Sequence, residues 1–276
     1  MELTISPILI KNATFGYSEK PVFENVSLSI EHGEIFCLMG RNGCGKSTLI
    51  DALFDINHLS SGEIEIMGKN LKEYSPSTLA EQISYVPQIH DKSFPYTVRQ
   101  IILMGRTIYT RHFGLYSSYD HEIVQKTMEK IGITGLADRP YTQLSGGEMQ
   151  MVMLARALVQ ETEIIVMDEP TAHLDYYNEL LFLEQVIDLV RTEKKTIIMA
   201  THSPNQPFFL EQTGLPIRVG LMKDGHIPIT GSPSEVLTKE NIQSVYNIES
   251  QVIHSDYQSV LLPRQTVSLK HESSGI

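Results

Sequence analysis

The sequence predicts an α/β fold with a mainly parallel sheet, an N-terminal antiparallel β-subdomain and an inserted α-helical subdomain. Short apolar or alternating runs dominate residues 8–86, and such runs are typical of strands. Helical spacing takes over between residues 98 and 159. After it, two buried-strand patterns flank a long helical pattern, which is typical of a βαβ unit and therefore of a parallel sheet.

The order of these patterns divides the chain into three units. Strands are expected over residues 8–15, 23–30, 34–39, 62–67, 83–86, 163–168, 196–200, 217–222 and 251–253, and helices over 98–104, 121–131, 146–159 and 176–192. The expected units are a core of residues 1–89 and 162–230, a helical subdomain of residues 90–161 and a C-terminal segment of residues 231–276. The polar tail from Arg264 to Ile276 lacks periodicity, so we expect it to be loose.

Composition excludes several classes of protein. The chain has 276 residues, of which 41% are apolar, and this is enough for a substantial core. The formal charge of −11 opposes binding to nucleic acid, which requires a surplus of Lys and Arg. No apolar run is long enough to span a membrane, and the first residues lack a signal-peptide pattern. Two cysteines, Cys37 and Cys44, form no disulfide framework and indicate a cytosolic protein.

A glycine-rich motif follows the apolar run 34–39. Residues 40–48 read Gly-Arg-Asn-Gly-Cys-Gly-Lys-Ser-Thr and match G-x-x-x-x-G-K-[ST]. A glycine-rich turn can match by chance, but a strand before it and a helix after it are the context that the phosphate loop needs. We expect Lys46 to reach the β- and γ-phosphates and the Ser47 hydroxyl to bind Mg²⁺. The motif predicts a P-loop NTPase core.

Two adjacent carboxylates end the apolar run 164–168. We expect Asp168 to hold Mg²⁺ through a water and Glu169 to polarise the water that attacks the γ-phosphate. Adjacent acids after a strand are commonly solvated loop residues. The phosphate loop in the same chain favours the catalytic interpretation.

Between these motifs lies Leu-Ser-Gly-Gly-Glu over residues 144–148. Ser145 and two glycines at a helix start form a second anion-binding turn, although an ordinary helix N-terminus would look the same. In this order, the phosphate loop, Leu-Ser-Gly-Gly-Glu and Asp-Glu-Pro resemble the nucleotide-binding subunit of an ABC transporter. The resemblance covers most of the chain.

The resemblance implies roles for four further residues. Tyr17 matches the aromatic that stacks on adenine; alternatively it is a strand-end aromatic of the core. Gln88 matches the glutamine that contacts Mg²⁺ and the attacking water and joins the two subdomains. His202 matches the histidine that contacts the γ-phosphate, although a lone histidine is usually structural. Asp175 matches the acid of a loop that crosses to a partner subunit.

The implied cofactors are ATP and Mg²⁺, and the implied catalytic residues are Glu169, His202 and Gln88. The expected nucleotide contacts are Tyr17, Gly40, Arg41, Asn42, Gly43, Cys44, Gly45, Lys46, Ser47, Thr48, Ser145, Gly146, Gly147, Glu148 and Asp175. The expected metal ligands are Ser47, Gln88 and Asp168.

Three positions prompt separate hypotheses. Ser203 stands where the family often has Asp, which can change how that loop is held. His173 replaces a small residue near the expected subunit interface, so it either gives a modest pH effect or only fills space. Cys44 has no pattern that supports a catalytic thiol, and we expect a thiol reagent there to block nucleotide binding by bulk alone.

The resemblance also implies partners. ATP would lie between the phosphate loop of one copy and the Ser145 turn of another, so the subunits would dimerise. The apolar run 94–106 would dock on a separate membrane permease, at the cytoplasmic face of the membrane, and a solute-binding protein would act indirectly. Alternatively, that apolar run is simply subdomain core.

Three segments resemble the importer branch that takes up iron chelates, haem, cobalamin, molybdate or tungstate. They are residues 98–106, the pair Asn205-Gln206 and residues 231–242. We therefore expect an ATPase that energises import of a metal chelate or of molybdate or tungstate. The alternatives are the ATPase of an ABC exporter and a soluble ABC ATPase without a transport role.

Overall fold

The central sheet determines where the site lies. The structure is a computed structural model that describes residues 5–88, 95–110, 115–255 and 259–267. Six strands lie in the order β10-β9-β3-β8-β7-β6, and β10 is antiparallel to β9 while the other neighbours are parallel. These strands are β3 (Ile35–Gly40), β6 (Ile83–Val86), β7 (Ile164–Asp168), β8 (Thr196–Thr201), β9 (Ile217–Lys223) and β10 (His226–Gly231). The predicted mainly parallel sheet is confirmed.

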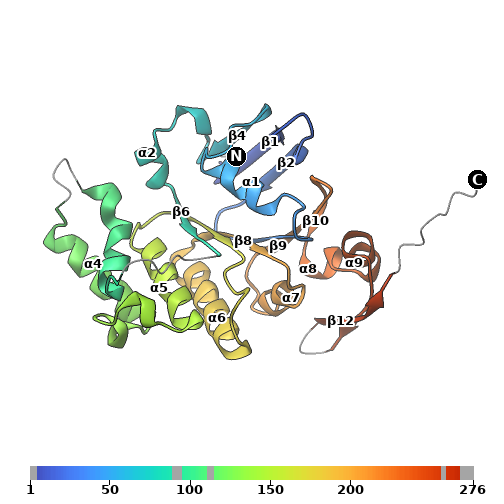
Figure 1. Cartoon of the computed structure of the whole chain (residues 1–276). Helices are drawn as coiled ribbons and strands as arrows, with labels where there is room; N and C mark the ends of the chain where they lie inside the picture. Colours follow the sequence, from blue (N-terminus) through green and yellow to red (C-terminus); the bar gives the residue numbers. More distant parts are fainter. Residues whose placement is uncertain (1–4, 89–94, 111–114, 256–258, 268–276) are drawn as a thin grey trace, which may run out of the picture.

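A second, antiparallel sheet covers one face of the first. Its order is β2-β1-β4-β5, with β1 (Ile8–Phe15), β2 (Phe23–Ile30), β4 (Ser61–Ile66) and β5 (Lys69–Asn70). Helix α1 (Lys46–Leu53) lies between the two sheets (Figure 1). The predicted antiparallel β-subdomain is confirmed.

Strand β3 is buried along its whole length because both faces of the sheet are covered. Successive side chains point to opposite faces of a strand. Phe36 and Leu38 accordingly join the apolar cluster under the antiparallel sheet, while Ile35, Cys37 and Met39 join the cluster on the other face. This two-sided burial fixes the end of β3, where the phosphate loop begins.

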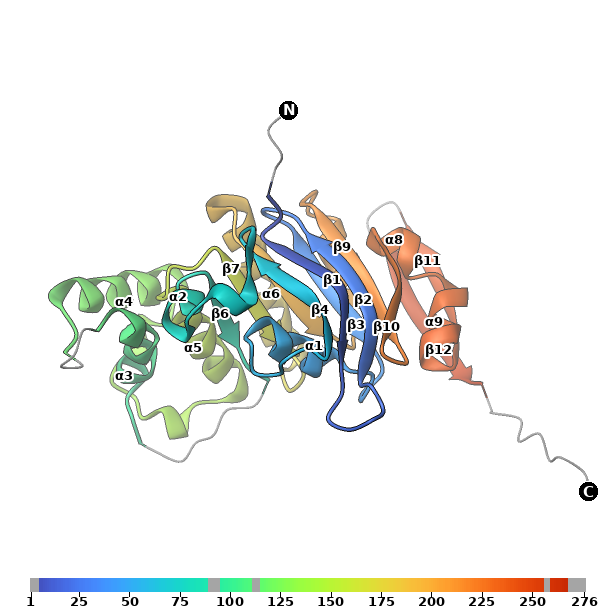
Figure 2. The same ribbon diagram turned by 90° about the horizontal axis from the view of Figure 1, so that it is seen from above.

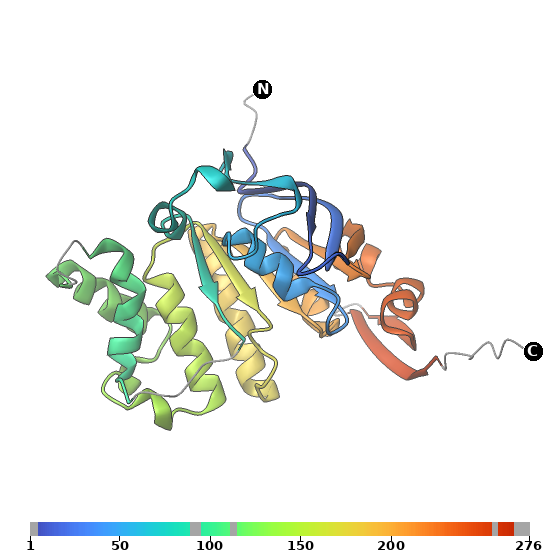
Figure 3. The same ribbon diagram turned by 45° about the horizontal axis from the view of Figure 1, so that its top comes forward.

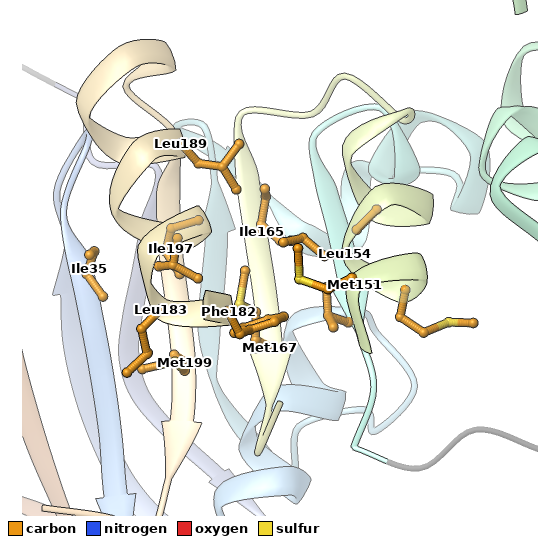
Figure 4. Close-up of a cluster of buried hydrophobic side chains, with 14 of the residues drawn as sticks. Ile35, Met151, Leu154, Ile165, Met167, Phe182, Leu183, Leu189, Ile197 and Met199 are labelled. Carbon is orange, nitrogen blue, oxygen red and sulfur yellow. The ribbon is translucent and has the colours of Figure 1, made fainter. Parts of the chain in front are cut away.

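Helices cover the other face of the central sheet. They include α5 (Gly146–Leu158), α6 (Tyr176–Glu193) and α7 (Asn205–Glu211). Figure 4 shows Phe182 and Leu183 of α6 against Met167 of β7 and Met199 of β8, and all four are almost fully buried. The apolar stripe of α6 therefore anchors the strands that end at Asp168 and Thr201.

The helical subdomain lies between β6 and β7 in the sequence and at one end of the core (Figure 3). Besides α5 it contains α3 (Val98–Leu103), α4 (Ser118–Lys130) and the 3₁₀ turns η2 (Met104–Tyr109), η3 (Thr134–Leu136) and η4 (Tyr141–Gln143). Helix α4 begins three residues before the expected start because Ser117 and Asp120 form a capping box. The limits of residues 90–161 stay a prediction, and residues 90–94 lie outside the described part.

The C-terminal segment lies at the opposite end of the core (Figure 2). It contains α8 (Pro233–Val236), α9 (Lys239–Tyr246) and the antiparallel pair β11 (Ile248–His254) and β12 (Ser259–Thr266). The prediction of a loose tail from Arg264 is wrong for its first three residues, which belong to β12. Their pairing partner is β11, and local periodicity does not report such pairing. Residues 268–276 lie outside the described part.

Other elements that the sequence analysis did not predict are short. They are β5, β10, η1 (Leu71–Glu73), η2, η3, η4, α2 (Pro76–Ala80), α7, α8 and α9. Strand β10 is an edge strand with an exposed alternate face, and its Pro228 weakens the strand pattern. Within the described ranges, none of the helices combines the length and the apolar character needed to cross a membrane.

Candidate active site

The phosphate loop joins the end of β3 to the start of α1. Gly45 precedes the helix with φ of +108°, and a Cβ there would lie 2.8 Å from the Met222 side chain, so only glycine fits without strain. No side chain caps the helix N-terminus. Its first backbone N–H groups are therefore available to an anion.

Lys46 is buried beneath this loop. Its Nζ donates hydrogen bonds to the carbonyl oxygens of Gly40 (3.0 Å) and Arg41 (3.3 Å), and it lies 3.4 Å from Glu169 Oε1. The two loop carbonyls on one side and the Glu169 carboxylate on the other thus hold the ammonium at the mouth of the loop. A phosphate in the loop would meet this charge directly.

Glu169 is the centre of the site. Gln88 Nε2 donates to Glu169 Oε2 (3.0 Å), and His202 Nδ1 lies 3.5 Å from the same oxygen. Gln88 follows β6, Glu169 follows β7 and His202 follows β8, and these strands are neighbours in the sheet. The carboxyl ends of parallel strands meet at one edge, which is where ligands bind in such sheets. The structure therefore brings together the three residues expected to be catalytic.

Asp168 is the candidate metal ligand. Its side chain accepts a hydrogen bond from Ser47, yet its buried Oδ1 has no hydrogen-bond partner. Burial raises the pKa of this carboxyl, as does the nearby Glu169 charge, against the lowering effects of Ser47 and Lys46. An unsatisfied carboxylate oxygen beside a hydroxyl fits a hard divalent cation such as Mg²⁺.

Among the described residues, no group of three or more His, Cys, Asp or Glu side chains could hold a metal ion. That does not count against Mg²⁺, because Mg²⁺ commonly uses one or two carboxylates with substrate phosphates and waters. Ser47 and Asp168 suit that arrangement as the protein ligands. Gln88 is hydrogen-bonded to Glu169, the residue after Asp168.

A cavity of about 290 Å³ opens above these groups. It is lined by Val22, Asn42, Gly43, Gly45, Lys46, Ser47, Thr48, Gln88 and Glu169. All but Val22 were expected to be site residues. Val22 was missed because a single apolar residue before a strand gives no sign of a ligand. Arg41 and Cys44 line a neighbouring cavity on the other side of the loop.

The Ser145 turn does not line the cavity that holds Lys46. Ser145 Oγ accepts from Glu148 N (3.3 Å), and Glu148 Oε2 accepts from Ser145 N (2.8 Å), which makes a capping box at the start of α5. Arg139 also donates to Glu148 (2.9 Å). In the single chain, these groups act as a helix N-terminus, which was the alternative interpretation, and Gly146 is exposed there.

Asp175 caps α6 beside this turn. Its Oδ1 accepts from Asn178 N (2.9 Å), and both its carboxylate oxygens accept from Asn178 Nδ2 (3.0 Å each). A Cβ on Gly147 would lie 2.4 Å from Asn178 Cγ. Gly147 therefore has a packing role that the sequence did not reveal: it lets the Ser145 turn and the Asp175 turn meet.

Three other predicted positions are accessible to different degrees. Tyr17 is 71% exposed and meets Phe15 edge to face at 4.9 Å, so it is not a core aromatic. His173 is exposed, and a titration role stays a hypothesis. Cys44 is partly buried, and burial raises the pKa of its thiol, which argues against a reactive thiolate.

Comparisons with known proteins identify the family of the chain. Residues 23–172 match the ABC transporter family. The molybdate import ATP-binding protein MolC of Haemophilus influenzae is 32% identical over 87% of this chain and 87% of its own length. The iron(3+)-hydroxamate import ATP-binding protein FhuC of Bacillus subtilis is 30% identical over 86% of this chain and 87% of its own. A solved inward-facing ABC transporter, described as metal-chelate type, has a chain that is 29% identical, with a TM-score of 0.80 over 94% of this chain and 98% of that one.

Proposed function

Because the chain belongs to the ABC transporter family and is an ATPase, we propose that it energises the import of a metal chelate or of an oxyanion such as molybdate. The observation that carries this proposal is similarity along nearly the whole chain to proteins named as import ATP-binding proteins. The metal-chelate description of the similar solved transporter supports the same class of cargo.

In the proposed reaction, the loop amides and Lys46 hold the β- and γ-phosphates of ATP. Ser47 and Asp168 would hold Mg²⁺, which when bound neutralises negative charge on the phosphates. Glu169 accepts a proton from the attacking water, and Gln88 and His202 orient the groups around it. The 3.0 Å and 3.5 Å contacts of these two side chains with Glu169 support that assignment.

We propose that the site is completed by a second copy. Ser145 and Asp175 lie together at adjoining turns but do not line the cavity of their own chain. A twofold arrangement would place the Ser145 turn of one copy against the phosphate loop of the other. ATP would then form part of the interface that it closes.

A membrane permease is the second proposed partner, with a solute-binding protein acting through it at the other side of the membrane. A groove of about 420 Å³ runs between the core and the helical subdomain. It is lined by Phe54, Pro76, Leu79, Ala80, Ile83, Ser84, Tyr85, Pro87, Met104, Gly105, Ile108, Arg156, Ala157 and Gln160. Its partly apolar floor suits a short helix of a permease, which would hold the chain at the cytoplasmic face of the membrane.

The position of this groove restricts the prediction that the apolar run 94–106 docks on a permease. Val98, Ile101, Ile102 and Leu103 are buried in the subdomain core, which is the alternative stated for that run, and residue 94 lies outside the described part. Only the end of the run reaches the groove, at Met104 and Gly105.

The import proposal is tested with Ala80→Arg, which places a charged chain in the groove. We expect loss of uptake and of copurification with a permease, while ATP hydrolysis by the isolated chain is retained, because Ala80 lies outside the phosphate cavity. Ser77→Arg is the matched control, since Ser77 is exposed on the same helix and does not line the groove. Normal uptake in Ala80→Arg would contradict the docking proposal.

The cargo is tested by measuring uptake of a labelled ferric hydroxamate and of labelled molybdate in cells with and without the chain. Loss of uptake of one cargo, restored by the intact chain and not by Glu169→Gln, is the expected result. Unchanged uptake of both would contradict the proposed substrate class.

A further inference from the structure

A buried amide lies directly behind the turn that carries His202. Gln206, in the first turn of α7, is 4% exposed and makes three short hydrogen bonds. Its Oε1 accepts from Thr201 Oγ1 (2.6 Å), and its Nε2 donates to Thr171 Oγ1 (2.7 Å) and to Glu179 Oε1 (2.7 Å). One side chain therefore joins β8, the segment after β7 and helix α6.

On one side, this amide fixes the His202 turn. Thr201 Oγ1 donates to Gln206 and also accepts from Ser203 N (3.1 Å). This one hydroxyl therefore links Thr201 to Ser203 across His202. Helix α7 has no side-chain cap of its own. The Gln206 contact thus holds Thr201 and, through its hydroxyl, Ser203, which lie on either side of His202.

On the other side, the amide reaches the segment that leads from Glu169 to Asp175. Thr171 is two residues beyond Glu169, and its carbonyl accepts from Leu174 N (3.1 Å). Glu179 N donates to Asp175 O (2.9 Å) in the first turn of α6. Movement of the Asp175 turn would therefore displace Thr171 and Glu179 and, through its hydrogen bonds with these two residues, the side chain of Gln206.

We propose that Gln206 is a positioning residue that couples the His202 turn to the turn holding Asp175, and so keeps His202 in register with Glu169. The inference rests on the proposed role of His202. Removing the amide takes the acceptor from Thr201 Oγ1 and the donor from Thr171 Oγ1 and Glu179 Oε1. This loosens the His202 turn, which keeps the bond from Ser203 N to Thr201 Oγ1. Small misplacement of a catalytic group lowers turnover more than binding.

The alternative is that Gln206 only stabilises the fold. A structural role and a positioning role both permit a lower melting temperature, so stability cannot separate them. Kinetics can, because groups that act as a unit give non-additive losses.

The test compares Gln206→Leu in the intact sequence and in a His202→Ala background, by steady-state ATP hydrolysis of the full-length protein over a range of ATP concentrations. We expect Gln206→Leu to lower kcat about tenfold with KM within about twofold. In the His202→Ala background we expect no further loss. An equal fold loss in both backgrounds, or an unchanged kcat in the single variant, would overturn the proposal.

Gln212→Leu is the matched control. Gln212 is the C-cap residue of the same helix, and its Nε2 donates to Phe208 O (3.2 Å) within that helix, away from the end that follows His202. We expect its kcat to remain within about twofold of the unmodified chain.

A charge exchange provides the rescue. Gln206→Glu sets a carboxylate against Glu179 and is expected to lower kcat as Gln206→Leu does. Adding Glu179→Gln restores a donor and an acceptor at that contact, and Thr171 can rotate its hydroxyl to donate. Recovery of kcat in the double variant is expected, and failure to recover would count against the hydrogen-bond network as the cause.

Different results would contradict the proposed role of His202 and the inference about Gln206. If His202→Ala alone leaves kcat unchanged, then the proposed role of His202 is wrong. If His202→Ala lowers kcat and Gln206→Leu does not, only the inference about Gln206 is wrong.

Discussion

Glu169 adopts a left-handed backbone conformation, with φ of +45°, directly after β7. Such a conformation stores strain in a non-glycine residue and is common at functional sites. Two hydrogen bonds support it: Glu169 N donates to Ala200 O of β8 (3.1 Å), and Glu169 O accepts from Ala172 N in the following turn (3.2 Å). The strained residue thereby aims its carboxylate at Lys46 and Gln88.

Glu169→Gln should lower kcat by about a hundredfold or more, because an amide cannot accept the proton of the attacking water. Its ATP affinity should change little, since the phosphate loop is intact. The measurement pairs steady-state hydrolysis with equilibrium binding of ATP. Glu163→Gln, directly before the opposite end of the same strand, is the control and should hydrolyse ATP normally. Near-normal turnover in Glu169→Gln would show that another group is the base.

Cys44 should react slowly with alkylating reagents at neutral pH. Burial raises the pKa of its thiol, and only the thiolate reacts, so the rate should rise as the pH rises toward that raised pKa. The Sγ lies close to Gly40, so an added group should block nucleotide binding. Mass spectrometry across pH, followed by ATP binding, checks both points. Normal ATP binding by fully alkylated protein would refute the steric block.

The site residues that could be predicted from sequence belong to motifs with fixed spacing. Lys46, Glu169 and His202 come together as predicted, although their roles stay predictions. Gln206 was named only as part of a resembling pair. Its function as a bridge could not be predicted, because its three partners come from separate segments and glutamine alone has no spacing signal.

At the scale of elements, two similar capping boxes allow an effect on stability to be distinguished from an effect on catalysis. Ser145 with Glu148 caps α5, and Ser232 with Glu235 caps α8 through the same pair of hydrogen bonds. Ser145→Ala and Ser232→Ala should each cost about 1 kcal/mol of unfolding free energy. Only Ser145→Ala should reduce ATP-dependent dimerisation and hydrolysis. Denaturant titration and light scattering measure these effects, and equal hydrolysis by the two variants would contradict the proposed role of Ser145.

The helical subdomain should depend on one buried ion pair. Arg106 and Asp120 are bonded at 2.9 Å with both side chains less than 10% exposed. Asp120→Asn should lower the unfolding free energy by about 2 kcal/mol, because it removes one of the two carboxylates that pair with the buried guanidinium and leaves the partly exposed Glu161 (2.6 Å) as its counter-charge. Glu122→Gln, which breaks the exposed pair with Lys126 on the same helix, should cost less than about 0.5 kcal/mol. Equal losses in the two variants would contradict this account.

The elements that could be predicted are those with strong local patterns. The continuous apolar runs of β3, β7 and β8 reflect strands covered on both faces, and α6 has a long apolar stripe. Strands β10 and β12 were missed for a physical reason. Strand β10 lies at the sheet edge and contains Pro228, while β12 lies in a hairpin and alternates little in polarity. Each is defined by its pairing with another segment.

At the scale of the whole molecule, the site described here is half of the proposed catalytic unit. The cavity above Lys46 is lined by the proposed phosphate contacts and the proposed base, while the Ser145 and Asp175 turns of the same chain do not line it. Within each copy, the proposed coupling through Gln206 links the residues around Glu169 to the turn that holds Asp175. Binding of ATP would then close two copies, and hydrolysis would weaken the pair.

The most direct measurement is a structure of full-length Glu169→Gln with Mg²⁺ and ATP. The account predicts a twofold pair in which the γ-phosphate lies between Lys46 of one copy and Ser145 of the other. A nucleotide bound at Lys46 with no Ser145 from a second copy beside it would contradict the shared site.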